Sequence, residues 1–519
     1  MLKHKLKRNK GITLIALVVT VIILIILAGI SISMLTGQNG ILNRAQEAKE
    51  KTKQSQAEEL SALSELENQM NNYQDDGFDT QKGANRPQLT SGMTRIMYEE
   101  PENGKNGKVI KDGETGFSTD WYDYSSKKWA NVMTKDGSMW VWIPRYAYKL
   151  DKENRTIDVI FLVGTSNKWY NPQTKQNEDL PAGYKVHPCF QNGKSNNYKN
   201  GEWKEEIRGI WVSKFEAGLP DDEKAAQANI TGMKKPYYPV FQGQKGSYNY
   251  ITVSECYLLS KALTDANNPY GLTISADSHL IKNSEWGAAA YLSYSNYGKG
   301  KNTEVFINNV SYGIAGGSTL KKSVRERNIH AITGYSASIK DDGQNILTSV
   351  TLGDEVTGKT KTSYAWHTIN GIKASSTGNI YGMYDMSGGA AEYTSTYVNV
   401  KTSSTLLENI KTYGTGFAYK NGAVVEGNTP YTMVYPEYTE GTLLEKIADI
   451  YGDAMNETAE WNDDWVNNDA SGPFFARGFY WGSESGAGVF SFADDDGYDY
   501  YDLLRFPLSP NNWIIFFKK

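Results

Sequence analysis

The sequence is poor in the residues that build disulfide frameworks and transition-metal sites. It contains two cysteines and five histidines among 519 residues. Two cysteines exclude a disulfide-rich scaffold. A Cys/His zinc site would need nearly all of these side chains, and they show no ligand spacing (Cys189, Cys256, His187, His279, His330 and His367). We therefore expect no metal and no cofactor, while the sequence leaves open whether Cys189 and Cys256 pair.

Other absences limit the fold and the partners. The chain has no repeat of 20–50 residues, no alternation of strands with helices, and no glycine-rich phosphate loop. Its net charge is −5, which argues against nucleic acid as a partner, because phosphate neutralisation needs clustered Lys and Arg. With 39% hydrophobic residues the chain can bury a core, and its length fits about three structural units.

The first residues differ from the rest of the chain. Five basic residues lie within positions 1–10, followed by an uncharged apolar run from Ile12 to Ile32. As a helix this run would span roughly 30 Å, the thickness of the bilayer interior. The basic residues predict a cytoplasmic N-terminus and an external remainder. A cleavable secretory signal and a plain anchor are alternatives, but neither explains the amphipathic helical pattern that continues to about residue 72.

This N-terminal segment resembles the type IV pilin and pseudopilin family. The resemblance is carried by the basic leader, then Gly11, then the apolar run that opens at Ile12. It implies that a prepilin peptidase cuts between Gly11 and Ile12, that the new N-terminus is methylated, and that other pilin subunits are possible partners. Ala16 stands where the family usually has Glu, which argues against efficient polymerisation as a major pilin. Removing five positive charges leaves an exported chain with a net charge of −10.

A large outer domain follows a polar linker at residues 73–95. From residue 96 short strand patterns alternate with Gly, Asn and Asp turns, and few helices are indicated. We therefore predict an α+β fold, with a long N-terminal helix followed by a domain rich in short strands and loops. The clearest strands are Met139–Pro144, Asp158–Val163 and Gly209–Lys214; the helices are Val253–Ala266 and Ser284–Leu292, with Ser284 as N-cap.

Residues from about 130 to 508 resemble the formylglycine-generating-enzyme family, a branch of the C-type lectin-like fold. Several separate blocks carry the resemblance: 139–144, 209–218, 279–291, 378–394, 476–478 and 504–506. The family's catalytic cysteine pair is missing, since residues 470–519 contain no Cys. The family also holds a structural calcium. Here Glu392 matches one ligand but Gly389 replaces an Asn, and capping of buried amides by Glu392 is the equally weighted alternative.

The C-terminal segment 477–506 has an unusual composition. Its residues 494–502 read DDDGYDYYD, and Asp, Tyr, Ser and Gly dominate the segment. All four can arise from Asn codons by changing adenines, although Trp481 and Glu484 cannot. The segment thus resembles the variable region of proteins that diversity-generating retroelements diversify, which lies at the end of a C-type lectin-like domain. Tyr with Ser, Gly and Asp is also the composition of an antibody paratope. A solvated acidic loop, a calcium loop without the DxDxDG spacing, or chance composition are the alternatives.

These features together predict a surface-displayed, adhesin-like binding protein rather than an enzyme. The ligand is an unknown extracellular protein or glycan, and the location is the cell membrane or surface. Alternatives are a minor pseudopilin that assembles filaments, or an enzyme on the formylglycine-generating fold. The expected organisation is leader 1–11, helix 12–72, linker 73–95 and binding domain 96–519. The expected binding residues are Tyr480, Trp481, Ser483, Ser485, Ser491, Asp494, Asp495, Asp496, Tyr498, Asp499, Tyr500, Tyr501 and Asp502.

Overall fold

The computed structural model describes residues 18–28, the single residues 49, 52 and 55, then 77–498 with gaps, and 515–518. The gaps are 195–196, 221–226, 229, 231–236, 249–250, 302–305, 309, 313–330, 339–345, 349–354, 358–361, 403, 460 and 480–485. The chain divides into two compact units, Met1–Glu67 and Asn68–Lys519, and each is described by itself.

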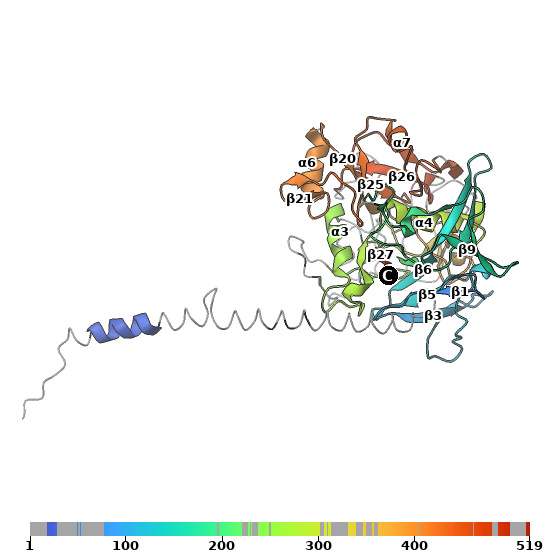
Figure 1. The fold of residues 1–519 in the computed structure, drawn as a ribbon. Coiled ribbons are helices and arrows are strands. Elements are labelled where there is room, and N and C mark those ends of the chain that lie inside the picture. Colours follow the sequence, from blue (N-terminus) through green and yellow to red (C-terminus); the bar gives the residue numbers. More distant parts are fainter. Residues whose placement is uncertain are drawn as a thin grey trace, which may run out of the picture. The chain divides into compact units, whose positions relative to one another are not determined.

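The first unit contains a helix over residues 18–28 (Figure 1). Its Val, Ile and Leu side chains are between 47% and 66% exposed. Among the described residues no helix combines the length and apolar character that a membrane span requires. Gly11, Ile12 and most of the predicted helix 12–72 lie outside the described residues, so their expected roles stay predictions.

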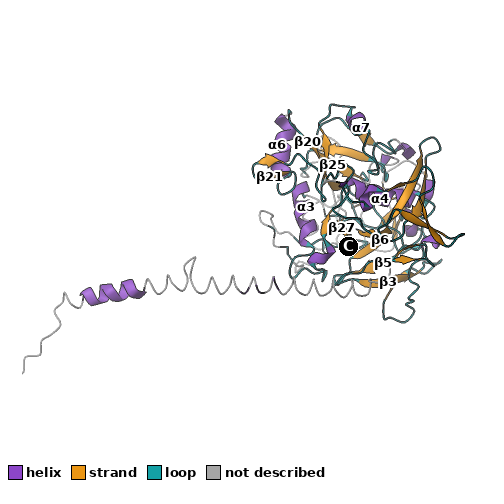
Figure 2. Cartoon of the chain, viewed as in Figure 1, coloured by secondary structure: helices purple, strands orange, loops and turns teal. Residues whose placement is uncertain are grey.

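The second unit is a mixed α+β fold with few helices and many short strands, as predicted from the sequence (Figure 2). Its largest sheet is antiparallel and has the order β13-β27-β12-β6-β5-β3-β4. The strands are Ser278–Leu280 (β13), Ile515–Lys518 (β27), Gly209–Ser213 (β12), Met139–Pro144 (β6), Asn131–Met133 (β5), Thr94–Glu99 (β3) and Lys108–Lys111 (β4). The strand predicted at Met139–Pro144 is thus confirmed, and all six of its residues are buried.

A second sheet has five strands and mixed directions. Its order is β23-β20-β25-β26-β24, with parallel pairs at both edges and antiparallel pairs between them. The strands are Met433–Pro436 (β23), Glu392–Asn399 (β20), Phe474–Arg477 (β25), Phe492–Asp495 (β26) and Val466–Asn467 (β24). Because β26 has a neighbour on each side, the predicted variable segment 477–506 contributes an inner strand to this sheet.

Smaller sheets and helices complete the described fold. A three-stranded sheet contains Lys185–Val186 (β11), Tyr146–Asp151 (β7) and Thr156–Phe161 (β8). A four-stranded sheet contains Phe306–Ile307 (β14), Tyr335–Ser338 (β16), Thr362–Ala365 (β19) and Glu355–Thr357 (β18). The two-stranded sheets pair Phe78–Asp79 (β1) with Ala84–Asn85 (β2), Lys168–Asn171 (β9) with Gln176–Asp179 (β10), Val310–Tyr312 (β15) with Ile346–Thr348 (β17), and Tyr419–Lys420 (β21) with Ala423–Val424 (β22). The α-helices are Val253–Ala262 (α3), Asn283–Tyr294 (α4), Ser404–Tyr413 (α6) and Leu443–Lys446 (α7). Short 3-10 turns are Tyr124–Ser126, Pro188–Phe190, Ile274–Ala276, Gly371–Ala374 and Trp461–Asp463.

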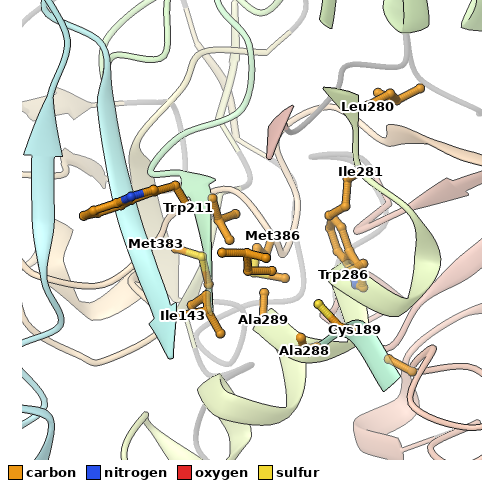
Figure 3. Close-up of a cluster of buried hydrophobic side chains, with 14 of the residues drawn as sticks. Ile143, Cys189, Trp211, Leu280, Ile281, Trp286, Ala288, Ala289, Met383 and Met386 are labelled. Carbon is orange, nitrogen blue, oxygen red and sulfur yellow. The ribbon is translucent and has the colours of Figure 1, made fainter. Parts of the chain in front are cut away.

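Helix α4 lies at the centre of the core. All twelve of its residues are buried, and the helix contacts β6 of the large sheet and β20 of the five-stranded sheet. Figure 3 shows Trp286, Ala288 and Ala289 of α4 among the apolar side chains of the core. Small residues permit this close packing: a Cβ at Gly287 would lie 2.0 Å from the carbonyl oxygen of Gly452.

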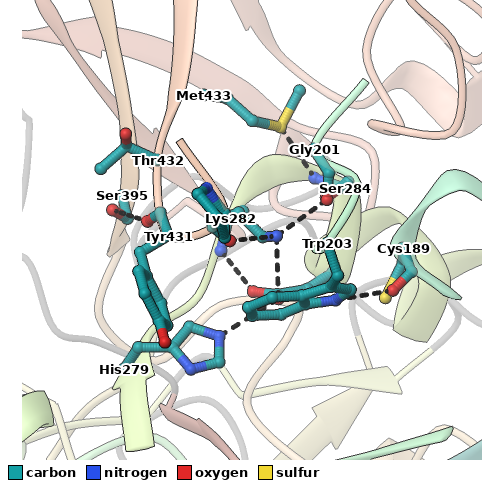
Figure 4. A network of polar contacts seen from close by, with 12 residues as sticks. Cys189, Gly201, Trp203, His279, Lys282, Ser284, Ser395, Tyr431, Thr432 and Met433 are labelled. Carbon is teal, nitrogen blue, oxygen red and sulfur yellow. Dashed lines mark hydrogen bonds and ion pairs between the residues drawn. The ribbon is translucent and has the colours of Figure 1, made fainter. Parts of the chain in front are cut away.

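The start of α4 corrects one prediction. Ser284, expected as the N-cap, lies inside the helix, and Lys282 occupies the cap position. The carboxylate of Glu285 accepts a hydrogen bond of 2.8 Å from the Lys282 backbone N–H. The Lys282 side chain is fully buried; its ammonium donates to the carbonyl oxygens of Gly201 and Pro430 and lies 3.5 Å from the centroid of the Trp203 ring (Figure 4). The Lys282 ammonium therefore links the start of α4 to the loops that contain Gly201 and Pro430.

Part of the expected linker belongs to the folded unit. Residues 77–95 form β1, β2 and the start of β3, and Phe78, Ala84 and Asn85 are buried. The Asn85 amide donates to the carbonyl oxygens of Gly164 and Arg208, both at 2.9 Å, and its side-chain oxygen accepts from the Gly164 N–H at 2.8 Å. The folded unit therefore starts before residue 96, and only residues 73–76 of the expected linker lie outside the described residues.

Candidate ligand-binding surface

The candidate surface is built on the antiparallel pair β25–β26. Phe475 faces Asp494 across the pair, and Phe474 faces Asp495. Directly opposed residues share a face of a sheet, and successive residues alternate between faces. Asp494 and Asp495 therefore point to opposite faces, each beside a buried phenylalanine.

Both ends of this frame depend on glycine. A Cβ at Gly472 would lie 2.0 Å from the carbonyl carbon of Asp495, so the turn before β25 runs directly against β26. Gly497 has φ +86°, and a Cβ there would lie 2.5 Å from the Phe474 ring. Its left-handed conformation turns the chain immediately after β26. Glycine thus fixes where the predicted variable segment leaves the sheet.

Asp494, predicted as a binding residue, is completely buried. Its Oδ2 accepts hydrogen bonds from the backbone N–H groups of Ser471 at 2.6 Å and Gly472 at 3.0 Å. Burial, together with the charge of Asp469, raises the pKa of Asp494 to about 7, against the opposing effect of these hydrogen bonds. Asp494 therefore joins the 471–472 turn to β26 and presents no carboxylate to solvent.

Asp495 and Asp496 are partly exposed and order the local backbone. Asp495 Oδ1 accepts from the Tyr393 hydroxyl at 2.6 Å and from the Gly497 N–H at 2.8 Å. Asp496 Oδ1 accepts from the Tyr498 N–H at 2.9 Å. Burial raises the pKa of Asp496 above its ordinary value. These two carboxylates hold the turn that presents Tyr498.

Two exposed aromatic side chains flank β26. Tyr498 follows the strand, is 37% exposed, and stacks on Tyr413 at the end of α6. Trp465 lies at the other end: its carbonyl oxygen accepts from the Phe492 N–H at 3.1 Å, and its indole is 47% exposed. The Trp465 ring stacks on Phe479 with centroids 5.3 Å apart. Large exposed rings held by a rigid sheet are suited to ligand contact.

The remaining predicted binding residues divide into two groups. Ser491 is buried, and its hydroxyl donates to the Gly488 carbonyl oxygen at 2.6 Å, so it stabilises a turn. Eight predicted residues lie outside the described part of the chain: Tyr480, Trp481, Ser483, Ser485, Asp499, Tyr500, Tyr501 and Asp502. Their role in binding stays a prediction.

The residues at the start of the segment are firmly held. The Arg477 guanidinium is buried and donates to the carbonyl oxygens of Asp453 at 3.1 Å and Ala454 at 2.8 Å. Burial lowers the pKa of Arg477 to about 10. Phe479 is buried with φ +52°, a left-handed conformation that is uncommon for a bulky residue. A constrained backbone therefore leads into residues 480–485.

The sequence did not predict that Trp465 and Tyr413 lie beside the segment 477–506. Both lie outside 477–506, so an argument based on Asn codons could not identify them. The composition of residues 461–469, WNDDWVNND, was a usable signal, since it repeats the Asn, Asp and aromatic content of the segment. The parallel pairing of β24 with β26, which places Trp465 there, has no local sequence signature.

The segment expected to match the family's calcium site is organised differently. Glu216, rather than Glu392, caps a backbone amide: its Oε2 accepts from the Ala390 N–H at 2.8 Å. A Cβ at Gly389 would lie 2.8 Å from the same Glu216 oxygen, so Asn does not fit there without movement. Burial raises the pKa of Glu392, and the charges of Glu216 and Asp385 add to this effect. The described residues include no group of three or more His, Cys, Asp or Glu arranged to hold a metal.

Comparison with known proteins gives no family assignment. No protein-family model matches the chain, and no curated protein matches it significantly.

Proposed function

We propose that this protein is a surface-displayed, adhesin-like binding protein whose ligand contacts residues in and around 477–506. The exposure of Trp465 and Tyr498 at the two ends of a buried strand is the observation that carries the proposal. Exposed aromatic residues supply much of the binding energy in protein recognition. The ligand is a protein or a glycan outside the cell, and the net charge of −5 argues against nucleic acid.

The arrangement around β26 supports the proposed role because the residues that stabilise the fold are different from those that are exposed for ligand contact. Asp494, Ser491 and Arg477 are buried and stabilise the frame, whereas the flanking rings are exposed. A domain of the C-type lectin-like, formylglycine-generating-enzyme type would present such a segment at its C-terminal end. Diversification by a retroelement would then alter the contacting residues while the glycines and buried residues keep the backbone in place.

Location and processing complete the proposal. A basic leader followed by the apolar run Ile12–Ile32 supports a single membrane helix with the C-terminus outside. The Gly11–Ile12 junction supports cleavage by a prepilin peptidase, after which the helix stays in the membrane or joins a pilus with other pilin subunits.

A binding array with matched variants tests the proposal. The full-length protein is screened against purified glycans and extracellular proteins, alongside the double variant Trp465→Ser, Tyr498→Ser. Ile274→Ser is the control, because Ile274 is 68% exposed and lies on the 3-10 turn Ile274–Ala276, outside the five-stranded sheet. We expect a bound ligand to be lost in the double variant and kept in the control. Binding that survives in the double variant would place the ligand site elsewhere.

The DNA around the coding sequence gives an independent test of diversification. We expect a neighbouring reverse-transcriptase gene and a near-copy of codons 477–506 rich in AAC. If the neighbouring DNA contained neither, the proposed diversification by a retroelement would be wrong. The proposed binding surface would then depend on the result of the binding array alone.

A further inference from the structure

A lysine and an asparagine are in contact inside the second unit, away from solvent. Lys214 directly follows β12 and Asn131 begins β5, and both side chains are completely buried. The Lys214 Nζ lies 3.0 Å from the Asn131 Oδ1. The rings of Tyr98 and Tyr384 line the same space, with centroids 4.9 Å and 5.4 Å from the Nζ. A buried amine and a carboxamide are therefore held together among aromatic side chains.

The other contacts of the Lys214 amine suit its neutral form. The Nζ donates hydrogen bonds to the carbonyl oxygens of Ile380 at 2.6 Å and Gly382 at 2.7 Å. A neutral amine has two N–H donors and one lone pair. These two hydrogen bonds use both donors and leave the lone pair on the side of Asn131. Burial lowers the pKa of Lys214 well below its usual value, which favours the neutral, nucleophilic amine.

The carboxamide of Asn131 is fixed and polarised by its own hydrogen bonds. Its Oδ1 accepts from the Tyr98 hydroxyl at 2.9 Å. Its Nδ2 donates to the carbonyl oxygens of Trp129 at 2.9 Å and Tyr381 at 2.8 Å. A donor aimed at the carbonyl oxygen stabilises the negative charge that develops there when a nucleophile attacks the carbon. Tyr98 is placed to supply that stabilisation at Asn131.

Glu100 is placed to move the proton. Its carboxylate hydrogen-bonds to the backbone of Ile380, the residue whose carbonyl oxygen binds the Lys214 amine. Among the described residues, Glu100 is the one whose charge affects the pKa of Lys214. Burial raises the pKa of Glu100, which makes its carboxylate a better base.

We propose that Lys214 and Asn131 form an intramolecular isopeptide bond once the domain has folded. The Nζ attacks the Asn131 Cγ, the bond from Cγ to Nδ2 breaks, and Glu100 carries one proton from the Nζ to the departing nitrogen. An amine and a primary amide thereby give a secondary amide and ammonia, with no oxidant, reductant or cofactor. The inference does not depend on the ligand-binding role.

The bond would strengthen the large sheet. β6 lies between β5 and β12, so the link would join two strands across a third. A covalent link between residues far apart in the sequence restricts the unfolded chain and stabilises the folded one, as a disulfide does.

Mass spectrometry of the full-length protein under denaturing conditions tests the bond. We expect a mass lower than that of the processed chain by one ammonia, and a branched peptide after protease digestion that joins Asn131 to Lys214. Lys282 is the internal control, because its ammonium is also buried against two backbone carbonyl oxygens. After unfolding, an amine reagent should label Lys282 and leave Lys214 unlabelled.

Variants separate the reaction from folding. Asn131→Ala and Lys214→Met should each show the full mass. Glu100→Gln alters only a half-buried side chain, so it should still melt cooperatively. Freshly expressed Glu100→Gln should nevertheless consist mainly of the unbonded chain, because loss of a proton carrier slows such a step by about 100-fold or more.

A full mass for the folded, unsubstituted protein would overturn the proposal. Lys214 would then be a charged ammonium bound by three carbonyl oxygens. A branched peptide that joins Lys214 to a residue other than Asn131 would overturn it as well. Complete bond formation in freshly expressed Glu100→Gln would overturn the role of Glu100.

Discussion

Tyr498 stacks on Tyr413 with ring centroids 5.1 Å apart and ring planes 29° apart. Tyr498 belongs to the predicted variable segment, whereas Tyr413 is the last residue of α6. Gly497 makes the stack possible, since a Cβ there would lie 2.9 Å from the Tyr413 Cβ. A ring that is one-third exposed is thereby held in a defined position by a residue outside the segment.

Replacing the segment's tyrosines should separate binding from stability. We expect Tyr498→Ser, Tyr500→Ser and Tyr501→Ser together to abolish ligand binding, because central aromatic contacts are each worth about 2 kcal/mol or more. Tyr498→Ser removes the stack on Tyr413. We therefore expect the free energy of unfolding to fall by only about 1 kcal/mol. Urea unfolding measures this change.

Phe474→Ala provides the contrast on the same frame. Phe474 is completely buried beneath Gly497, and truncating a core phenylalanine costs about 3–5 kcal/mol. If the triple tyrosine variant lost as much stability as Phe474→Ala, the tyrosines would be core residues and the segment would not be a display surface.

The folded unit should require residues before position 96. A chain beginning at residue 73 should unfold cooperatively, whereas one beginning at 96 lacks Asn85 and exposes the groups it binds. The Gly164 N–H and the buried Gly164 carbonyl group each lose the hydrogen bond to Asn85, at a cost of about 1–3 kcal/mol each, whereas the Arg208 carbonyl keeps its hydrogen bond from the Arg145 N–H. Thermal melts of the two chains measure the difference, and Asn85→Ala in the longer chain isolates this residue's share. Equal stability of the two chains would return residues 73–95 to the role of a linker.

Strong local patterns predicted individual elements well. The run Met139–Pro144 is apolar throughout and ends at proline, and it forms β6 with the expected bounds. The helix expected at Val253 begins there but ends at Ala262, and the chain continues in a turn at Thr264–Asp265. The strand expected at Asp158–Val163 is displaced to Thr156–Phe161, where pairing with β7 sets its register.

Long-range pairing could not be predicted in the same way. Polar residues 77–95 look like a linker because their buried contacts, such as Asn85 with Gly164, are made to residues far along the chain. Asp494 looks like a solvated acid in an acidic run, but its place on an inner strand buries it against the 471–472 turn. Composition identified the segment, and only the sheet order distinguishes its buried residues from its exposed ones.

Both cysteines should be unreactive thiols in the folded protein. Cys189 and Cys256 are buried and form no disulfide with each other, and burial raises the pKa of the Cys189 thiol well above its ordinary value. We expect slow reaction with a thiol reagent in the native state, two reactive thiols after unfolding, and no effect of a reductant on the melting temperature. A melting temperature that falls on reduction would indicate a disulfide.

The N-terminal junction should be a processing site. Intact mass measurement of the protein extracted from membranes should show a chain that starts at Ile12, with or without one added methyl group. Gly11→Val should leave the leader attached, because a peptidase needs close backbone approach at this position. Ser31→Val is the control, as it alters the apolar run without changing the junction. A chain that still starts at Met1, or one cut near Gly37, would contradict the resemblance to pilins.

The stability of the protein should decrease as pH rises from about 4 to 7, in part through Asp385. Burial raises the pKa of this carboxyl to about 7, against hydrogen bonds from the Gly334 N–H at 2.9 Å and the Asn308 amide at 2.9 Å. The ordinary value is 3.8, so within this pH range the folded protein holds a proton that the unfolded chain has released. The free energy of unfolding then falls with pH, by at most about 1.4 kcal/mol per pH unit for this one group. Above pH 7 both states are ionised and the contribution ends.

Asp385→Asn should flatten that dependence, because an amide cannot titrate. Asp385 has φ +67°, a conformation that Asn also adopts, so the backbone has no reason to move. Urea unfolding at pH 5 and pH 8 gives the difference in the free energy of unfolding for each protein, and the exposed-acid variant Asp463→Asn should keep the slope of the unsubstituted protein. The comparison uses slopes, so a uniform loss of stability in Asp385→Asn does not affect it. An unchanged slope in Asp385→Asn would mean that Asp385 is ionised throughout this range and that its hydrogen bonds outweigh its burial.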